Sequence, residues 1–302
     1  MAPARRRLCG AMEVHERLCE EVISYRQNIV RNDEFTERAL HTGEAQRTAR
    51  RLITIPTVVH VVYKRDRENI SKAQIRSQLD VLNRDFRARN PDRSKVPDVW
   101  KSLVSDAKIE FALATRNPNG KRTDGITRTK TDRTAFGADD SVKKAGQGGV
   151  AAWPTTRYLN IWVCNLSGGL LGYAQFPGGP ARTDGVVCTH SAFGTSGTAQ
   201  APFNRGRTAT HEIGHWLNLR HIWGDTLGCG GSDRVSDTPN AAGPNYGKPT
   251  WPVITCNNGP NGDLFMNYMD YVDDAAMFMF TPGQIARMNA SLAGPRKKIG
   301  RR

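Results

Sequence analysis

Three histidines and one glutamate lie in one short segment, residues 211–221, of this 302-residue chain. On an α-helix His211 and His215 are one turn apart and project from the same face, so both imidazoles can bind one metal ion. A zinc ion with three protein ligands keeps a fourth position for water and lowers the pKa of that water to about 7. Glu212 would point beside the two histidines, where it can activate this water without being a ligand. We therefore predict that Glu212 is a general base, and later the acid that protonates the leaving amine.

His221 can be the third ligand only if the helix ends after Leu217, because a continuing helix would carry it away from the metal. The turn needs a residue that tolerates positive φ, and Asn218 is the best occupant after glycine. Two histidines and a glutamate can share a helix face by chance, as hydrogen-bonded core or surface side chains. A third histidine at this spacing argues against that alternative. The sequence predicts one zinc ion per chain, bound by His211, His215 and His221.

The downstream segment NYMDY, residues 267–271, resembles the Met-turn of metzincin proteases, a tight turn that places a methionine beneath the zinc. Met269 fits that role. Tyr271 stands where several metzincins place a phenol near the metal, where it can donate a hydrogen bond to an oxyanion. The alternative is an ordinary half-buried tyrosine. Metzincins usually carry glycine at the position of Asn218, and asparagine is a mild departure from that pattern.

Longer stretches resemble the pappalysin family of metzincins, and its microbial branch with ulilysin, mirolysin and cytophagalysin-like enzymes most closely. They are GRTATHEIGHWLNLRHIWGD, GLLGYAQFP, DRVSDTP and NYMDY, spread over most of residues 52–292. The resemblance implies an α+β metzincin fold. This fold has a twisted five-stranded mixed sheet, a backing helix, an active-site helix and an irregular lower subdomain. It also implies a zinc-dependent endopeptidase acting on proteins or peptides.

The resemblance implies calcium as a second cofactor. Asp233, Asp237 and Thr238 would supply the hard oxygen ligands that calcium prefers. The alternative is a solvated acidic turn. A disulfide between Cys229 and Cys256 also matches the family, and it would staple a loop rich in Gly, Pro and Asn. Such a bond fits a secreted or otherwise extracytoplasmic protein.

The N-terminal motif Arg7-Leu8-Cys9-Gly10 resembles a cysteine switch. A thiolate is a strong zinc ligand, so Cys9 in the open position would displace the water and keep the enzyme latent. The alternative is a stray surface cysteine. We predict a proenzyme whose residues 1–50 form an inhibitory propeptide. The basic junction 47–51 is the candidate processing site.

Periodic patterns give the elements that must position these residues. Residues 1–50 are highly charged and favour helices, whereas residues 57–63 are β-branched and favour a buried strand. A capping box at Ser71 opens a predicted helix over 72–88, and a second helix covers about 207–219. Further strands are predicted at 109–114, 158–164, 173–176 and 185–188. The strand at 173–176 is expected at an edge of the sheet. Residues 223–260 are predicted to be irregular. The predicted catalytic domain spans residues 51–292, and residues 293–302 are predicted to form a basic C-terminal tail.

Specificity is predicted from residues 270–280, which follow the Met-turn and would line the pocket for the side chain after the scissile bond. Asp273 and Asp274 stand there among Ala, Met and Phe. An apolar tube that ends in a carboxylate suits lysine or arginine, and the resemblance also points to cleavage before a basic residue. We assign the pocket charge to Asp274. The alternative is that both aspartates are solvated or structural.

Composition excludes several other classes. The net charge is +14, but the basic residues are scattered, so we expect no specific nucleic-acid partner. No apolar run is long enough to span a membrane, and the first residues do not read as a signal peptide. An amidase and a non-catalytic zinc module are rival functions. Glu212 argues against the module, because a structural zinc site has no need of a base.

Overall fold

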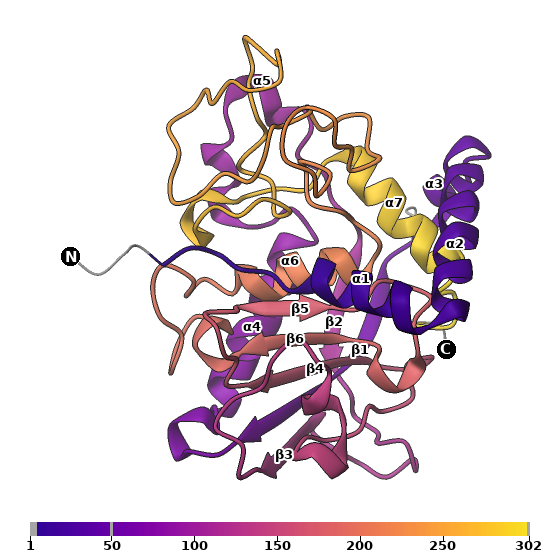
Figure 1. Ribbon diagram of the computed structural model, residues 1–302, viewed down its shortest axis with the longest axis vertical. Helices are drawn as coiled ribbons and strands as arrows, with labels where there is room; N and C mark the ends of the chain where they lie inside the picture. The colour runs from indigo at the N-terminus through magenta and orange to yellow at the C-terminus, as the bar shows by residue number, and fades with distance from the viewer. Residues whose placement is uncertain (1–4, 49–50, 301–302) are drawn as a thin grey trace.

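A mixed β-sheet forms the lower half of the computed structural model in the view of Figure 1; the structure describes residues 5–48 and 51–300. Five strands run in the order β2-β1-β4-β6-β5, and β3 pairs with the second half of β1. All pairs are parallel except β5 with β6. The strands are β1 (Ile53–Tyr63), β2 (Ile109–Leu113), β3 (Ile126–Lys130), β4 (Leu159–Cys164), β5 (Gly172–Ala174) and β6 (Val186–Thr189).

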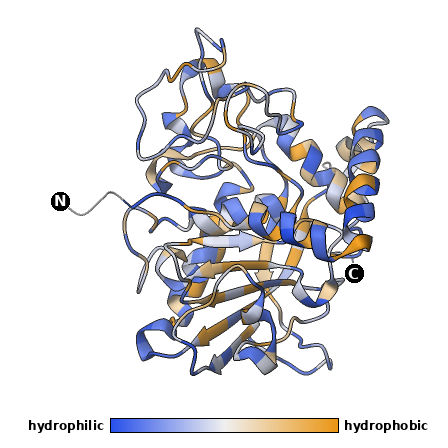
Figure 2. Cartoon of the chain, viewed as in Figure 1, coloured by the Kyte–Doolittle hydropathy of each residue, from blue (hydrophilic) through white to orange (hydrophobic). Residues whose placement is uncertain are grey.

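The strand β1 is central because its β-branched residues can be buried on both faces. Val58 to Val62 are almost fully buried, and Figure 2 shows the strands largely in the colours of apolar residues. β5 is an edge strand, as predicted. The strand β3 was not predicted. Its sequence, ITRTK, alternates polar and charged residues and is only partly buried, so it lacks the apolar pattern of a core strand.

Two helices, α4 (Lys72–Asp85) and α6 (Arg207–Trp216), pack against each other and against the sheet. The helix α4 begins where Ser71 Oγ accepts a hydrogen bond from Gln74 N at 3.1 Å, and it contacts β2 and α6. The helix α6 is entirely buried. Both end earlier than predicted, at Asp85 and Trp216. The short helix α5 is Asp98–Lys101, and α7 is Pro282–Ala293.

The N-terminal segment is helical, as predicted from the sequence. It forms α1 (Ala11–Glu21), α2 (Ile23–His41) and α3 (Glu44–Thr48). The helix α1 contacts the edge strand β5, whereas α2 and α3 pack against α7 (Figure 1). Residues 49 and 50 of the basic junction lie outside the described residues. The segment therefore crosses the front of α6 before it reaches α7.

Between α6 and α7 the chain is irregular, as expected. Within this fully described stretch the structure assigns one 3-10 turn, Asp274–Ala276, and no named strand or α-helix. A disulfide joins Cys229 to Cys256, with a Cα–Cα distance of 5.3 Å. No helix among the described residues is long and apolar enough to cross a membrane.

The expectation of a basic C-terminal tail needs correction. Residues 294–300 turn back onto the domain, and Arg296 and Ile299 are buried. The Arg296 guanidinium donates two hydrogen bonds to Asp184, both at 2.8 Å, and lies over the Trp216 ring. A run of basic residues looks like a solvated tail in the sequence, but this arginine has a buried carboxylate partner far away in the chain.

Candidate metal centre and active site

The end of α6 brings the third histidine back towards the first two. Asn218 has a φ of +76°, as predicted for the turn residue. Leu217 N donates to Ile213 O and Leu219 N donates to Gly214 O, both at 2.9 Å. These bonds close the last helical turn in the manner of a C-cap with a left-handed residue. The chain can then return and place His221 beside the helix.

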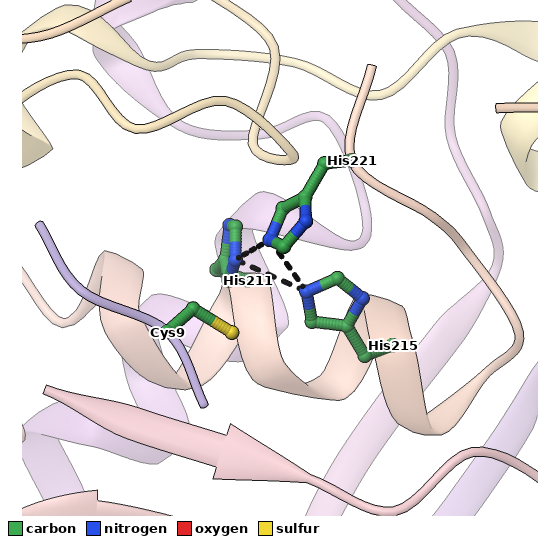
Figure 3. Close-up of side chains that lie close together, drawn as sticks. All are labelled: Cys9, His211, His215 and His221. Carbon is green, nitrogen blue, oxygen red and sulfur yellow. Dashed lines mark hydrogen bonds between the residues drawn. The ribbon is translucent and has the colours of Figure 1, made fainter. Parts of the chain in front are cut away.

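The three imidazoles converge on one point (Figure 3). The Nε2 atom of His211 lies 3.2 Å from that of His215 and 3.2 Å from that of His221. The Nε2 atoms of His215 and His221 are 3.0 Å apart. Two nitrogens bound tetrahedrally to zinc at about 2.0–2.1 Å would be roughly 3.3 Å apart. The triangle has the dimensions of a set of zinc ligands.

The other ring nitrogens fix which atoms face the centre. Nδ1 of His211 contacts Tyr268 O at 2.7 Å, and Nδ1 of His215 contacts Leu219 O at 2.8 Å. Nδ1 of His221 contacts the Asp225 carboxylate. Since carbonyl and carboxylate oxygens only accept, each Nδ1 carries the proton and each Nε2 presents a lone pair. Three lone pairs at this separation need a shared cation.

Burial supports the neutral forms of these rings. Burial, together with the smaller effect of the neighbouring histidines, lowers the pKa of His211 well below its usual range and that of His215 to about 3. A neutral imidazole is the form that binds a metal. The donor set therefore fits zinc.

Cys9 completes this cluster. Among the described residues, Cys9 and the three histidines form a group whose ligand atoms all lie within 4.8 Å of one another (Figure 3). The Cys9 segment is held by backbone bonds: Gly10 N donates to Gly172 O at 2.9 Å, and Leu171 N donates to Leu8 O at 3.0 Å. Burial and the Glu212 carboxylate raise the pKa of the Cys9 thiol, so a thiolate at this position needs a cation beside it.

Glu212 lies beside the histidines and is buried. Burial raises the pKa of its carboxyl to about 8, although the Cys9 hydrogen bond and the charge of Arg7 oppose the shift. Its Oε2 lies 3.4 Å from Cys9 Sγ. The backbone of β5 also approaches it closely, because a Cβ on Gly172 would lie 2.9 Å from Glu212 Cγ. Glu212 thus stands between the edge strand and the metal cluster.

A tight turn lies beneath the centre. Asp270 N donates to Asn267 O at 3.1 Å, which closes the turn that carries Met269. Met269 is fully buried, and a Cβ on Gly214 of α6 would lie only 2.4 Å from its sulfur. The glycine in the zinc motif therefore makes room for the methionine. The NYMDY segment predicted a methionine beneath a zinc ion, and that role stays a prediction.

Tyr271 follows the turn and stands next to the third histidine. Its ring centroid lies 4.8 Å from that of His221, edge to face, and 4.8 Å from that of Trp223. The side chain is partly buried. Burial raises the pKa of its phenol, so it keeps its proton and can act as a donor.

Asp274 is fully buried and accepts a hydrogen bond from Arg7 of the N-terminal segment. Arg7 Nη2 lies 2.6 Å from Asp274 Oδ1, and Arg7 Nε lies 3.2 Å from Val272 O. On the other side, the backbone N–H groups of Arg205 and Arg207 donate to Asp274 Oδ2 at 2.7 and 3.2 Å. The segment that follows the Met-turn thus supplies a carboxylate, Asp274, that binds the guanidinium of Arg7. Asp273 is partly exposed.

The predicted calcium ligands make contacts of their own. Asp233 accepts from Val235 N at 3.0 Å and from Thr238 Oγ1 at 2.7 Å. Asp237 accepts from Thr281 Oγ1 at 2.6 Å and from Gly283 N at 2.7 Å, at the start of α7. Burial raises the pKa of Asp233 to about 6. These residues order the loop, and calcium binding there stays a prediction.

Two residues that matter to the site were not singled out from the sequence. Asp225 fixes the His221 ring and follows it by four positions, so its spacing was a usable signal. Arg7 stood inside the quoted RLCG motif, but its partner Asp274 is 267 residues away. No local pattern reveals a contact of that kind.

Comparison with known proteins identifies the family. A family model described as "Pregnancy-associated plasma protein-A" matches residues 144–293. An extracellular metalloprotease of Pyricularia oryzae is 33% identical, over 94% of this chain and 88% of the relative. An extracellular metalloprotease of Arthroderma benhamiae is 32% identical, over 85% of each chain.

The chain belongs to the pappalysin family of metalloproteases.

Solved structures of this family show the same fold. Mature mirolysin of Tannerella forsythia in complex with a cleaved peptide is 52% identical, covers 82% of this chain and 94% of its own, and has a TM-score of 0.80. A point mutant of Tannerella forsythia promirolysin is 45% identical, covers 97% of this chain and 96% of its own, and has a TM-score of 0.86. The α+β metzincin fold is confirmed. This pappalysin-family protein is a metalloendopeptidase, and its family implies a catalytic zinc.

Proposed function

We propose that this chain is the latent precursor of a secreted zinc endopeptidase that cleaves before arginine or lysine. The convergence of the Nε2 atoms of His211, His215 and His221, with Glu212 beside them, carries the proposal. These histidines would hold one zinc ion, which when bound polarises a carbonyl and lowers the pKa of a water. The substrates are proteins or peptides, and no specific nucleic-acid partner is expected.

The protein supplies the proton transfers. Glu212 takes a proton from the attacking water and gives it to the leaving amine. Tyr271 keeps its phenolic proton and donates a hydrogen bond to the oxyanion that develops on the substrate carbonyl. Met269 packs beneath the histidines through Gly214 and holds the floor of the site. Asp225 fixes the tautomer and orientation of His221.

The matched pair of Glu212→Ala and His215→Ala tests this assignment. Glu212→Ala should keep stoichiometric zinc and lose activity by roughly 100- to 10,000-fold, because only proton transfer is removed. His215→Ala should lose zinc and activity together. Zinc content by metal analysis and cleavage of casein, with and without a chelator, separate the two. A Glu212→Ala enzyme with nearly full turnover would show that another group activates the water.

Latency is assigned to residues 1–50. Cys9 would occupy the open metal position, and the segment around it pairs with β5, the edge strand where a substrate backbone would lie. The proposal divides the chain into this propeptide and a catalytic domain, residues 51–292. Cleavage at the basic junction 47–51 would release the enzyme. The similarity to a promirolysin supports a zymogen.

Specificity for a basic residue is assigned to Asp274. Arg7 already supplies the guanidinium that such a pocket would receive, and it donates to Asp274 at 2.6 Å. A buried carboxylate with a bound arginine is a charge-assisted contact that lysine or arginine of a substrate can reproduce. The same preference would allow the enzyme to cut its own junction.

Calcium and export complete the proposal. Asp233, Asp237 and Thr238 offer oxygen ligands within one loop, which is suited to calcium. The disulfide Cys229–Cys256 and the extracellular relatives support secretion.

A further inference from the structure

A second charged contact anchors the N-terminal segment. Asp33 of α2 accepts hydrogen bonds from Arg287 Nη2 at 2.9 Å and from Arg234 Nη1 at 2.5 Å. The Arg287 side chain is 2% exposed and the Arg234 side chain 41%. One carboxylate of the N-terminal segment thus bridges a buried guanidinium and a partly exposed one.

Arg287 has a second hydrogen-bond partner besides Asp33. Its Nε donates to Asn218 O at 2.7 Å, so the guanidinium is tied to the turn that precedes His221. Burial lowers the pKa of Arg287, the Asp33 carboxylate opposes this effect, and the charges of Arg220 and Arg234 add to it. Asp233 also acts on this cluster electrostatically, but its oxygens accept from Val235 N and Thr238 Oγ1. Several cationic groups therefore gather around the Asp33 carboxylate.

This cluster borders the site. A small cavity next to it is lined by residues that include Asp33, Phe176, Asn218 and Arg220. The Phe176 ring lies 5.3 Å from that of His215. Asp274, which accepts from Arg7, contacts the backbone at the start of α6, whereas Arg287, which donates to Asp33, contacts Asn218 just after the end of that helix. The arginines therefore lie on the far side of the histidines from Asp274.

We propose that Arg287 and Arg234 bind an Asp or Glu side chain of the substrate, upstream of the scissile bond, and that Asp33 fills this site in the latent form. The inference rests on the proposed function, in which Asp274 receives the residue after the bond, so the opposite side receives the residues before it. When residues 1–50 leave, Arg287 stays bound to Asn218 O while its Nη2 loses the carboxylate. A guanidinium held in a fixed orientation favours a new carboxylate in the same place.

The test uses enzyme matured from the full-length, zinc-loaded chain. Peptides with a fixed arginine after the scissile bond would carry Glu or Gln at each of the six preceding positions, one at a time. At one position, Glu should raise kcat/KM by roughly fivefold over Gln, the size expected for a partly exposed charged contact. Arg234→Gln should remove this preference, and Arg234→Glu should invert it. Arg157→Gln, at an exposed arginine near Pro118, is the control and should leave the preference unchanged.

The outcomes separate this inference from the proposed function. If no position prefers Glu, while arginine after the bond is still preferred to glutamine, the upstream site is wrong and the proposed function stands. If neither preference appears, both fall. A preference for Glu that survives Arg234→Glu would also overturn the site, because another group must then recognise the acid. A preference that disappears only in Arg234 variants supports it.

Discussion

Two contacts of opposite charge and different exposure hold the N-terminal segment on either side of the histidine cluster. At one end Asp274 accepts from Arg7, and both side chains are at most 1% exposed. At the other end Asp33 bridges Arg287 and Arg234, of which the second is 41% exposed. In the first contact the N-terminal segment supplies the base and its partner the acid, and in the second these roles are reversed.

The difference lies in how each end is supported. Asp274 receives two backbone N–H groups on the side away from Arg7, so its carboxylate is fixed before any guanidinium arrives. Arg287 is fixed by one backbone carbonyl, whereas its companion Arg234 reaches out from a loop. A preorganised, desolvated contact discriminates more strongly than an exposed one. We therefore expect the acid end to select substrates and the basic end to modulate their rates.

Asp274→Asn tests the strong end and should have the largest effect. Truncating one partner of a buried charge pair costs about 2–5 kcal/mol, which corresponds to a loss of roughly 30- to 5,000-fold in the preference for arginine over glutamine after the bond. Peptide-library profiling of the matured enzyme measures it. Asp273→Asn is the matched control and should keep the preference. An unchanged profile in Asp274→Asn would move the pocket charge to another acid.

The centre of the segment should come next. Cys9→Ser removes a strong zinc ligand and should speed processing of the full chain by roughly tenfold or more. Gel analysis of the time course of conversion measures it. Cys19→Ser changes a partly buried thiol on α1 that is not in the metal cluster, so it should leave the time course unchanged. Equal rates for both variants and the parent would assign latency to contacts other than Cys9.

The predictions for the centre of the site rest on local patterns. The zinc segment with its turn at Asn218 is one short run of residues, and NYMDY with Met269 is a second. The structure brings His211, His215 and His221 together as the spacing indicates. The structure also places Cys9 in the same cluster. A short motif can be interpreted because helix geometry and turn preferences act over a few residues.

Both charged ends show what the sequence could not reveal. Asp274 was selected as a pocket charge, but its partner Arg7 was not. The pair of Asp33 and Arg287 was missed entirely, because 254 residues separate them. The missed strand β3 and the buried Arg296 have a similar cause, since polar side chains give no periodic signal for a distant partner.

Calcium should affect the basic end through the loop that carries Arg234. A ligand at ten times its dissociation constant stabilises the native state by about 1.4 kcal/mol, or roughly 3–6 °C in melting temperature for a domain of this size. Chelation that spares zinc should lower the melting temperature by that amount. Asp233→Asn should lose this calcium dependence. A melting temperature that does not respond to calcium in the parent would contradict the assignment of Asp233, Asp237 and Thr238.

Asp33→Asn should have the smallest effect and makes the comparison sharpest. The substitution keeps the shape of the side chain but removes the charge between Arg287 and Arg234, so it should speed processing of the full chain by roughly three- to fivefold. Glu34→Gln, at an exposed neighbour on α2, should not change the rate. Because the proposed processing at 47–51 would remove residue 33, kcat/KM after maturation should equal that of the parent. A faster conversion with unchanged kcat/KM therefore reports on the latent contact alone. If Asp33→Asn instead accelerated processing as much as Cys9→Ser, the contact of Asp33 with the two arginines would contribute as much to latency as the metal cluster. The partial exposure of Arg234 would then be a poor guide to the strength of the contact.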